Sequence, residues 1–252
     1  METSKKMKKI IWIDVGTHFA QEHNSLFGPN LKFYILILRR FIGGGLLKRG
    51  RFVDFSDLKD IFILRKKIRG YRKDIFSIFV EANPKIAHKK KFYPSADLFF
   101  NIALTNERFS AVSIAKLYIG HGDVLSEGNS IFSEKHSSSD NEHIATLGVS
   151  TDNFFNELNL YLKEKFSNFD VLLRLNCEGV EDDVIYSAHK SFGKKLKLIS
   201  GSLKDVEELK GITASNNLDN YMESNNLTFV KFSSGIYSWP DAHKAILGLI
   251  ED

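Results

Sequence analysis

Hydrophobic and polar positions along this chain alternate in blocks that predict strands separated by helices. Five short runs rich in β-branched and aromatic residues are predicted to be buried strands. They cover residues 9–15, 75–81, 96–103, 170–176 and 195–200. Apolar residues at helical spacing predict a helix that begins at Ser56, with Ile61, Leu64 and Ile68 on its apolar face, and another over 151–166. This alternation is typical of a parallel sheet covered by helices on both faces.

Two segments interrupt the alternation. Residues 111–119 and 142–149 predict an antiparallel excursion around a polar tip, and residues 23–74 predict a basic, partly helical insertion between the first two core strands. We expect the residues after Gly201 to complete the sheet with an antiparallel C-terminal strand. The predicted fold is therefore α/β, a Rossmann-like, doubly wound, mostly parallel sheet, in a single domain over 1–252.

Composition limits the location and the cofactor chemistry of the protein. Cys177 is the only cysteine among 252 residues, which excludes an intramolecular disulfide and a multi-cysteine zinc site. No run approaches the ~20 apolar residues of a membrane-spanning helix. These features predict a cytoplasmic protein.

Charge is distributed unevenly along the chain. The net charge is +4, but residues 31–73 hold thirteen Lys or Arg against three Asp, a surplus of +10 that leaves −6 for the rest. This segment is predicted to meet any anionic partner, such as lipid headgroups or a sugar phosphate, at the periphery of a membrane or in solution. The alternative is solvated structural charge. Nucleic acid is not favoured, because no basic strand is interleaved with aromatic residues. The candidate contact residues are Arg39, Arg40, Lys48, Arg49, Arg51, Arg65, Lys66 and Lys67.

Candidate binding residues are concentrated where the first two core strands end. The first ends in IDVGTHFA, and a glycine bend after a parallel strand brings backbone amides close to a bound nucleotide. The next core strand ends at Glu81 in FVEANP, where a carboxylate can accept hydrogen bonds from both hydroxyls of a ribose. Each signal alone also fits an ordinary turn or a solvated carboxylate. Together they predict a nucleotide site with Asp14, Gly16 and Glu81 at its centre.

A third element, LLRLNCEGVEDD, follows a later strand. Asn176 and Glu178 are candidates to orient a substrate or accept its proton at the same sheet edge. The alternative is that the acidic residues only stabilise the start of a helix, which we favour for Asp182 and Asp183.

These segments, in this order, resemble FkbM-type S-adenosylmethionine-dependent methyltransferases. The strands of that family typically read D-V-G-A-N-x-G, E-P-N-P and K-x-D-x-E-G-x-E. The similar segments here are IDVGTHFA, FVEANP, NIAL, STDNFF and LLRLNCEGVEDDVI, and they cover most of residues 9–190 apart from the insertion.

The resemblance implies S-adenosyl-L-methionine as cofactor and O-methylation of a small-molecule, glycan or lipid acceptor. It implies that the loop after the first strand lines the methionine end, that Glu81 holds the ribose with Asn83 beside it, and that Asn176 and Glu178 face the methyl group. The implied loop residues are Asp14, Gly16, Thr17, His18 and Phe19, and Asn101 and Ile102 are implied near the adenine.

Departures from the pattern affect the catalytic base. Ala20 replaces the final glycine of the first loop, and we expect it to be tolerated because Ala takes most helical positions. Asn176 replaces an Asp, and an amide is not a general base, so the base would be Glu178 or a His such as His121, or positioning alone would suffice. No carboxylate set for magnesium is evident, and we predict no obligatory metal. The alternatives are a catalytically degenerate scaffold and a peripheral membrane or polyanion-binding adaptor that acts through the insertion.

Overall fold

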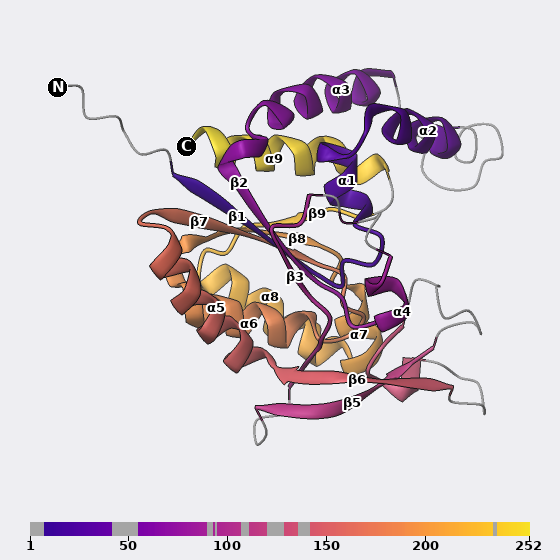
Figure 1. Cartoon of the computed structure of the whole chain (residues 1–252), viewed down its shortest axis with the longest axis vertical. Coiled ribbons are helices and arrows are strands. Elements are labelled where there is room, and N and C mark those ends of the chain that lie inside the picture. The colour runs from indigo at the N-terminus through magenta and orange to yellow at the C-terminus, as the bar shows by residue number, and fades with distance from the viewer. Residues whose placement is uncertain are drawn as a thin grey trace.

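The computed structural model describes residues 8–41, 55–89, 93, 95–106, 111–119, 129–135, 142–233 and 236–252. Its centre is a six-stranded sheet in the order β3-β2-β1-β7-β8-β9 (Figure 1). The strands are β1 (Lys9–Val15), β2 (Ile75–Val80), β3 (Leu98–Phe100), β7 (Phe169–Leu175), β8 (Leu196–Gly201) and β9 (Phe229–Lys231). All neighbouring strands in it are parallel, and helices cover both faces. The predicted Rossmann-like, doubly wound fold is confirmed.

The expected antiparallel C-terminal strand is wrong. β9 pairs with β8 in parallel, Ile199 opposite Phe229. The reason is the connection: helices α7 (Lys204–Lys210) and α8 (Ile212–Ser224) carry the chain back across the sheet before β9 begins, and such a crossover returns the next strand in the same direction.

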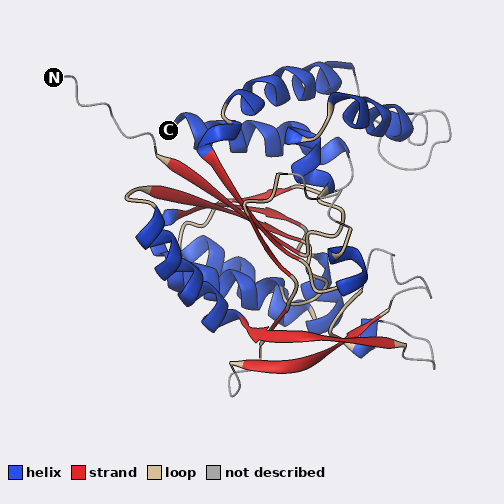
Figure 2. Ribbon diagram, in the orientation of Figure 1, coloured by secondary structure: helices blue, strands red, loops and turns tan. Residues whose placement is uncertain are grey.

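Side chains of β1 alternate between two cores, one on each face of the sheet. Ile11, Ile13 and Val15 pack with α5 (Thr151–Lys165), α6 (Glu181–Phe192), α7 and α8. Ile10 and Trp12 pack with α1 (Gln21–Phe27), α2 (Asn30–Phe41), α3 (Phe55–Gly70) and α9 (Trp239–Glu251). Figure 2 shows these two groups of helices on opposite sides of the strands. Because both faces are covered, the strands read as continuous apolar runs rather than as alternating ones.

The run over 96–103 forms two short strands instead of one. β3 belongs to the main sheet, whereas β4 (Ala103–Thr105) pairs in parallel with β6 (His143–Ser150) in a second sheet of order β4-β6-β5. The chain bends between them at Asn101, whose side-chain amide donates to the Glu81 carbonyl at 2.7 Å. The predicted antiparallel pairing is confirmed, since β5 (Val112–Tyr118) pairs with β6 in that way, whereas the predicted polar tip, residues 136–141, lies outside the described residues.

The basic insertion contributes most of α1 and all of α2 and α3, and α3 packs against α9 and α1. As predicted, Ile61 and Ile68 of α3 are buried and Leu64 packs against the same core. Arg65, however, is not a surface cation. Its guanidinium donates to the carbonyls of Ser25 and Gly28 at 2.6 and 2.8 Å and to Asn30 Oδ1 at 2.9 Å, so it fastens the end of α1.

The remaining candidate contact residues divide into two groups. Lys66 and Lys67 are exposed on α3. Arg39 and Arg40 belong to α2, but their side chains lie outside the described part, as do Lys48, Arg49 and Arg51. Within the described ranges, no helix has both the length and the apolar character needed to cross a membrane.

Candidate functional site

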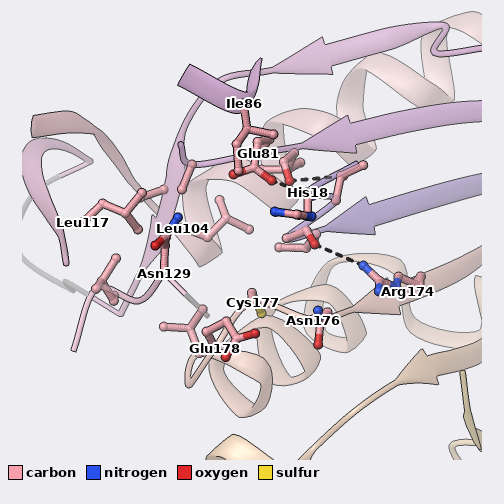
Figure 3. A pocket seen from close by; sticks show the side chains of 18 of the residues that line it. His18, Glu81, Ile86, Leu104, Leu117, Asn129, Arg174, Asn176, Cys177 and Glu178 are labelled. Carbon is pink, nitrogen blue, oxygen red and sulfur yellow. Dashed lines mark hydrogen bonds between the residues drawn. The ribbon is translucent and has the colours of Figure 1, made fainter. Parts of the chain in front are cut away.

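A cavity of about 220 Å³ lies at the carboxyl edge of the sheet, where the strand order reverses between β1 and β7. Ligands of open α/β sheets bind at such topological switch points, in cavities of ~300–1,000 Å³. Figure 3 shows side chains from β2, β7 and the second sheet converging on this space. The lining residues include Gly16, Thr17, His18, Glu22, Glu81, Ile86, Ile102, Leu104, Leu117, Arg174, Asn176, Cys177 and Glu178.

Gly16 is required where the β1 loop meets the β7 loop. Its φ is 70°, and a Cβ atom there would lie 2.0 Å from the Asn176 carbonyl oxygen. Hydrogen bonds of 3.0 Å fix the approach, from Gly16 N to the Val80 carbonyl and from Asn176 N to the Val15 carbonyl. Only glycine fits this bend without a shift of the backbone.

Ala20 does not occupy an ordinary helical position. It precedes α1 with φ 51° and ψ 40°, in the left-handed region, and is fully buried. We expected Ala20 to be tolerated because Ala takes most helical positions, and this reason is wrong because the backbone at Ala20 is not helical. A left-handed Ala costs roughly 1–2 kcal/mol, so a glycine would suit this position better.

Glu81 faces the glycine bend across two adjacent parallel strands. One oxygen, Oε2, accepts from His18 N at 2.6 Å, and Oε1 accepts from Asn83 N at 2.8 Å. Burial raises the pKa of this carboxyl to about 7, although the two amide hydrogen bonds lower it. Among the described ion pairs none involves Glu81. Two of its four acceptor positions therefore remain for a ligand.

At the cavity wall, the guanidinium of Arg174 joins two carboxylates in a buried cluster. Arg174 and Asp14 are register partners on β7 and β1, and Arg174 Nη1 lies 3.0 Å from Asp14 Oδ1. Its Nη2 lies 2.8 Å from Glu22 Oε2 on α1, and Nη1 also donates to the Gly16 carbonyl at 3.1 Å. Burial raises the pKa of Asp14 to about 6 against the lowering effect of Arg174. Burial lowers the pKa of Arg174, but the two carboxylates outweigh it and raise that pKa.

The loop after β7 is held by a second set of charges. Glu178, with φ 60°, forms an ion pair with Lys135, whose amine also lies 2.5 Å from Asp205 Oδ1. The Glu181 carboxylate accepts from Cys177 N at 3.0 Å and from Gly179 N at 2.8 Å. Glu178 thus enters the cavity as the partner of a cation rather than as a free base.

Asp182 and Asp183 both pair with Lys210, at 2.6 and 2.8 Å. This arrangement agrees with the structural role favoured for them in the sequence. Burial raises the pKa of the Cys177 thiol well above its usual value, so Cys177 is not an activated nucleophile although it lines the cavity.

The predicted site residues fall into three groups. Gly16, Thr17, His18, Glu81, Ile102, Asn176 and Glu178 line the cavity. Asp14, Phe19, Asn83 and Asn101 do not: Asp14 is fully buried against Arg174, and Asn83 and Asn101 hold Glu81 through its carboxylate and its carbonyl. His121 lies outside the described residues.

Sequence reasoning missed Arg174, Glu22 and Lys135. Arg174 had a local signal, because it follows the apolar run Val171, Leu172 and Leu173 inside a buried strand, and a buried guanidinium requires partners. Glu22 and Lys135 had none, since both reach the site through tertiary packing of distant elements.

Two buried histidines, His23 and His243, are structural. Burial lowers the pKa of each to about 3, and they pack among aromatic rings of the core. His23 Nε2 lies 3.0 Å from Ser77 Oγ. Over the described ranges, no three His, Cys, Asp or Glu side chains are grouped so that they could hold a metal ion.

Fold and cavity together define a doubly wound α/β protein with a cavity at its switch point. In comparisons with known proteins, no family model, no curated protein and no solved structure matches this chain.

Proposed function

We propose that this chain is an S-adenosyl-L-methionine-dependent methyltransferase that methylates a hydroxyl group of a sugar, lipid or small molecule. The observation that carries the proposal is the contact between the Glu81 carboxylate and His18 N at 2.6 Å. It brings the Glu81 carboxylate, our candidate for binding the ribose, and the glycine bend to one cavity, at the sheet edge where open α/β sheets bind ligands.

The chemistry of the cavity supports a nucleoside of this kind. Glu81 keeps acceptor capacity for ribose hydroxyls, and Ile86, Ile102 and Leu104 supply an apolar wall for an adenine ring. The charged residues that line the cavity are three Glu and Arg174. Glu22 pairs with Arg174 and Glu178 pairs with Lys135, so Glu81 is the lining carboxylate that no described ion pair compensates. Such a carboxylate favours a cationic ligand such as a sulfonium and opposes a phosphate group, so a dinucleotide fits this site less well.

When bound, S-adenosyl-L-methionine supplies a methyl group that is already activated by the positive sulfur. The work of the protein is then to align the acceptor. Asn176 can orient a hydroxyl through its amide. We assign Glu178 to positioning as well, because it is held in an ion pair with Lys135. We also propose a cytoplasmic location, since Cys177 is the only cysteine.

Titration calorimetry with S-adenosylhomocysteine tests the cofactor site. We expect Glu81→Gln to weaken binding about 10–100-fold, because it removes charge-assisted hydrogen bonds to the ribose. Glu134→Gln, at an exposed position, is the matched control and is expected to bind normally. No binding to the unmodified protein at about 1 mM ligand would refute the proposal, since that corresponds to less than about 4 kcal/mol.

A ligand series separates this proposal from a generic nucleotide site without relying on a variant. Adenosine is expected to bind more tightly than adenosine 5′-monophosphate, because a phosphate meets the uncompensated Glu81 carboxylate. The reverse order would assign the cavity to phosphate-bearing nucleotides. Binding of S-adenosylhomocysteine without transfer of labelled methyl to any acceptor tested would identify a degenerate scaffold instead of an enzyme.

A further inference from the structure

Helix α2 presents apolar side chains to solvent as well as to the core. Phe33 and Ile37 are buried, but a second stripe at i, i+3, i+4 and i+7 is exposed. It consists of Leu31 (70% exposed), Tyr34 (51%), Ile35 (46%) and Leu38 (57%). A face that is apolar at this spacing is the pattern by which a helix docks on an apolar phase.

Helix α3 extends this surface. Its exposed Phe62 stacks on Tyr34 with ring centroids 5.7 Å apart, and Ile63 is 46% exposed beside it. One turn along α3, Lys66 and Lys67 are exposed, and Lys59 is exposed one turn before Phe62. We call this surface, Leu31, Tyr34, Ile35, Leu38, Phe62 and Ile63 with Lys59, Lys66 and Lys67, the α2-α3 face.

The combination of apolar centre and positive charge selects one kind of partner. A second copy of the chain would bring two segments of +10 together, which is repulsive. A dissolved polyanion would use the lysines but leave the apolar stripe without a role. An anionic bilayer uses both, because apolar side chains enter the acyl region while basic residues meet the headgroups. With 12 residues, α2 is long enough to lie on a bilayer and too short to cross it.

We propose that the α2-α3 face docks this protein on the surface of an anionic lipid membrane. In this arrangement α2 lies in the membrane interface with its exposed stripe toward the acyl chains, and α3 contributes Phe62, Lys59, Lys66 and Lys67. Figure 1 shows α2 and α3 on the outer side of α9, away from the sheet. Docking is independent of the proposed methyl transfer, so its test requires no cofactor.

Sedimentation of the full chain with vesicles tests the proposal. We expect binding to phosphatidylcholine vesicles that contain about 30% phosphatidylglycerol, with little binding to phosphatidylcholine alone. Binding should weaken between about 0.1 M and about 1 M salt as the Debye length falls from about 10 Å to about 3 Å. Absence of binding to the anionic vesicles would overturn the proposal.

Variants locate the docking face. Lys66→Gln with Lys67→Gln is expected to weaken the partition about 30-fold, since each basic residue near an anionic surface contributes roughly fivefold. Leu31→Ser with Leu38→Ser is expected to weaken it at least about tenfold. The matched controls lie on other elements: Lys163→Gln with Lys194→Gln, and Leu160→Ser with Ile212→Ser, all at exposed positions. Equal losses in the controls would overturn the assignment.

Insertion of α2 into the bilayer can be measured directly by tryptophan fluorescence. Both native tryptophans, Trp12 and Trp239, are fully buried, so a new tryptophan at Leu38→Trp dominates quenching by brominated lipid. We expect quenching for Leu38→Trp and none for Leu160→Trp on α5. The proposal is wrong if neither is quenched, or if sedimentation velocity shows a dimer that dissociates in the Leu31→Ser and Leu38→Ser variant.

Discussion

Replacing Arg174 with Met is expected to destabilise the protein by about 3–5 kcal/mol near neutral pH, the cost of removing one partner of a buried ion pair. The two carboxylates left behind are Asp14, fully buried, and Glu22, 4% exposed. Each lies within 3.0 Å of the guanidinium, on a different element. Met fills much of the volume of Arg, so the loss reports the uncompensated charges more than a cavity.

The pH dependence identifies the cause of that loss. Burial already raises the pKa of Asp14 to about 6 in the presence of Arg174. Without the guanidinium, the pKa of Asp14 rises further above its unfolded value. Such a group contributes stability that is present at low pH and lost as the pH rises through the folded pKa. In urea unfolding experiments, the deficit of Arg174→Met should therefore shrink between about pH 7 and about pH 5.

Two further variants provide the comparison. Adding Asp14→Asn and Glu22→Gln to Arg174→Met should recover most of the stability, because no buried charge then remains. Lys190→Met breaks an exposed pair with Asp152 and should cost no more than ~1 kcal/mol. A deficit for Arg174→Met below about 1 kcal/mol, or one that does not change with pH, would refute the reasoning.

Three other changes test separate parts of the structure. Gly16→Ala should cost more in urea unfolding than Gly193→Ala, for which we expect about 1–3 kcal/mol from backbone strain alone. Both glycines have a positive φ, but only a Cβ at Gly16 meets the backbone, which adds about 1–3 kcal/mol. Equal costs would contradict the close approach. The affinity for S-adenosylhomocysteine, measured by calorimetry, should rise with pH by up to about tenfold per unit until about pH 7, the raised pKa of Glu81, and should be constant above it. The reason is that the proposed role requires the ionised carboxylate to accept hydrogen bonds from the ribose. An affinity that does not change with pH would contradict this role. Arg65→Lys should destabilise the protein by about 2 kcal/mol, because an ammonium cannot make all the hydrogen bonds of the guanidinium. The control Lys66→Arg should leave the stability unchanged. Equal melting temperatures for the two variants would contradict the role of Arg65 in holding the end of α1.

The core strands were predictable because their pattern is local. The run 9–15 matches β1, and the predicted strand over 170–176 differs from β7 by one residue at each end. In a sheet covered on both faces, most strand residues are apolar, so the run itself marks the element. The order of strands and helices then fixed the fold class, since right-handed crossovers leave few arrangements.

Contacts made across the insertion were not predictable in the same way. A count of basic residues cannot separate Arg65, which binds the backbone of α1, from Lys66, which is exposed beside it. The difference depends on which face of α3 meets α9 and α1. Likewise, the direction of β9 depends on how the two preceding helices cross the sheet, and the apolar run over 96–103 gives no sign of the bend at Asn101.

Arg174 lies within the segment LLRLNCEGVEDD, but its ion-pair partners lie on other elements. In K-x-D-x-E-G-x-E, the pattern to which LLRLNCEGVEDD was compared, Arg174 occupies the place of the lysine. A lysine there could neutralise one carboxylate of the neighbouring strand as a point charge. The planar guanidinium reaches Asp14, Glu22 and the Gly16 carbonyl at once, which ties β1, α1 and the glycine bend to β7. Asp14 is therefore held in the ion pair with Arg174, whereas no described ion pair compensates Glu81, the carboxylate that we propose for the nucleoside. The partner of each carboxylate thus separates the one that stabilises the fold from the one that remains available to a ligand. That partner is visible only in the packing of the folded chain.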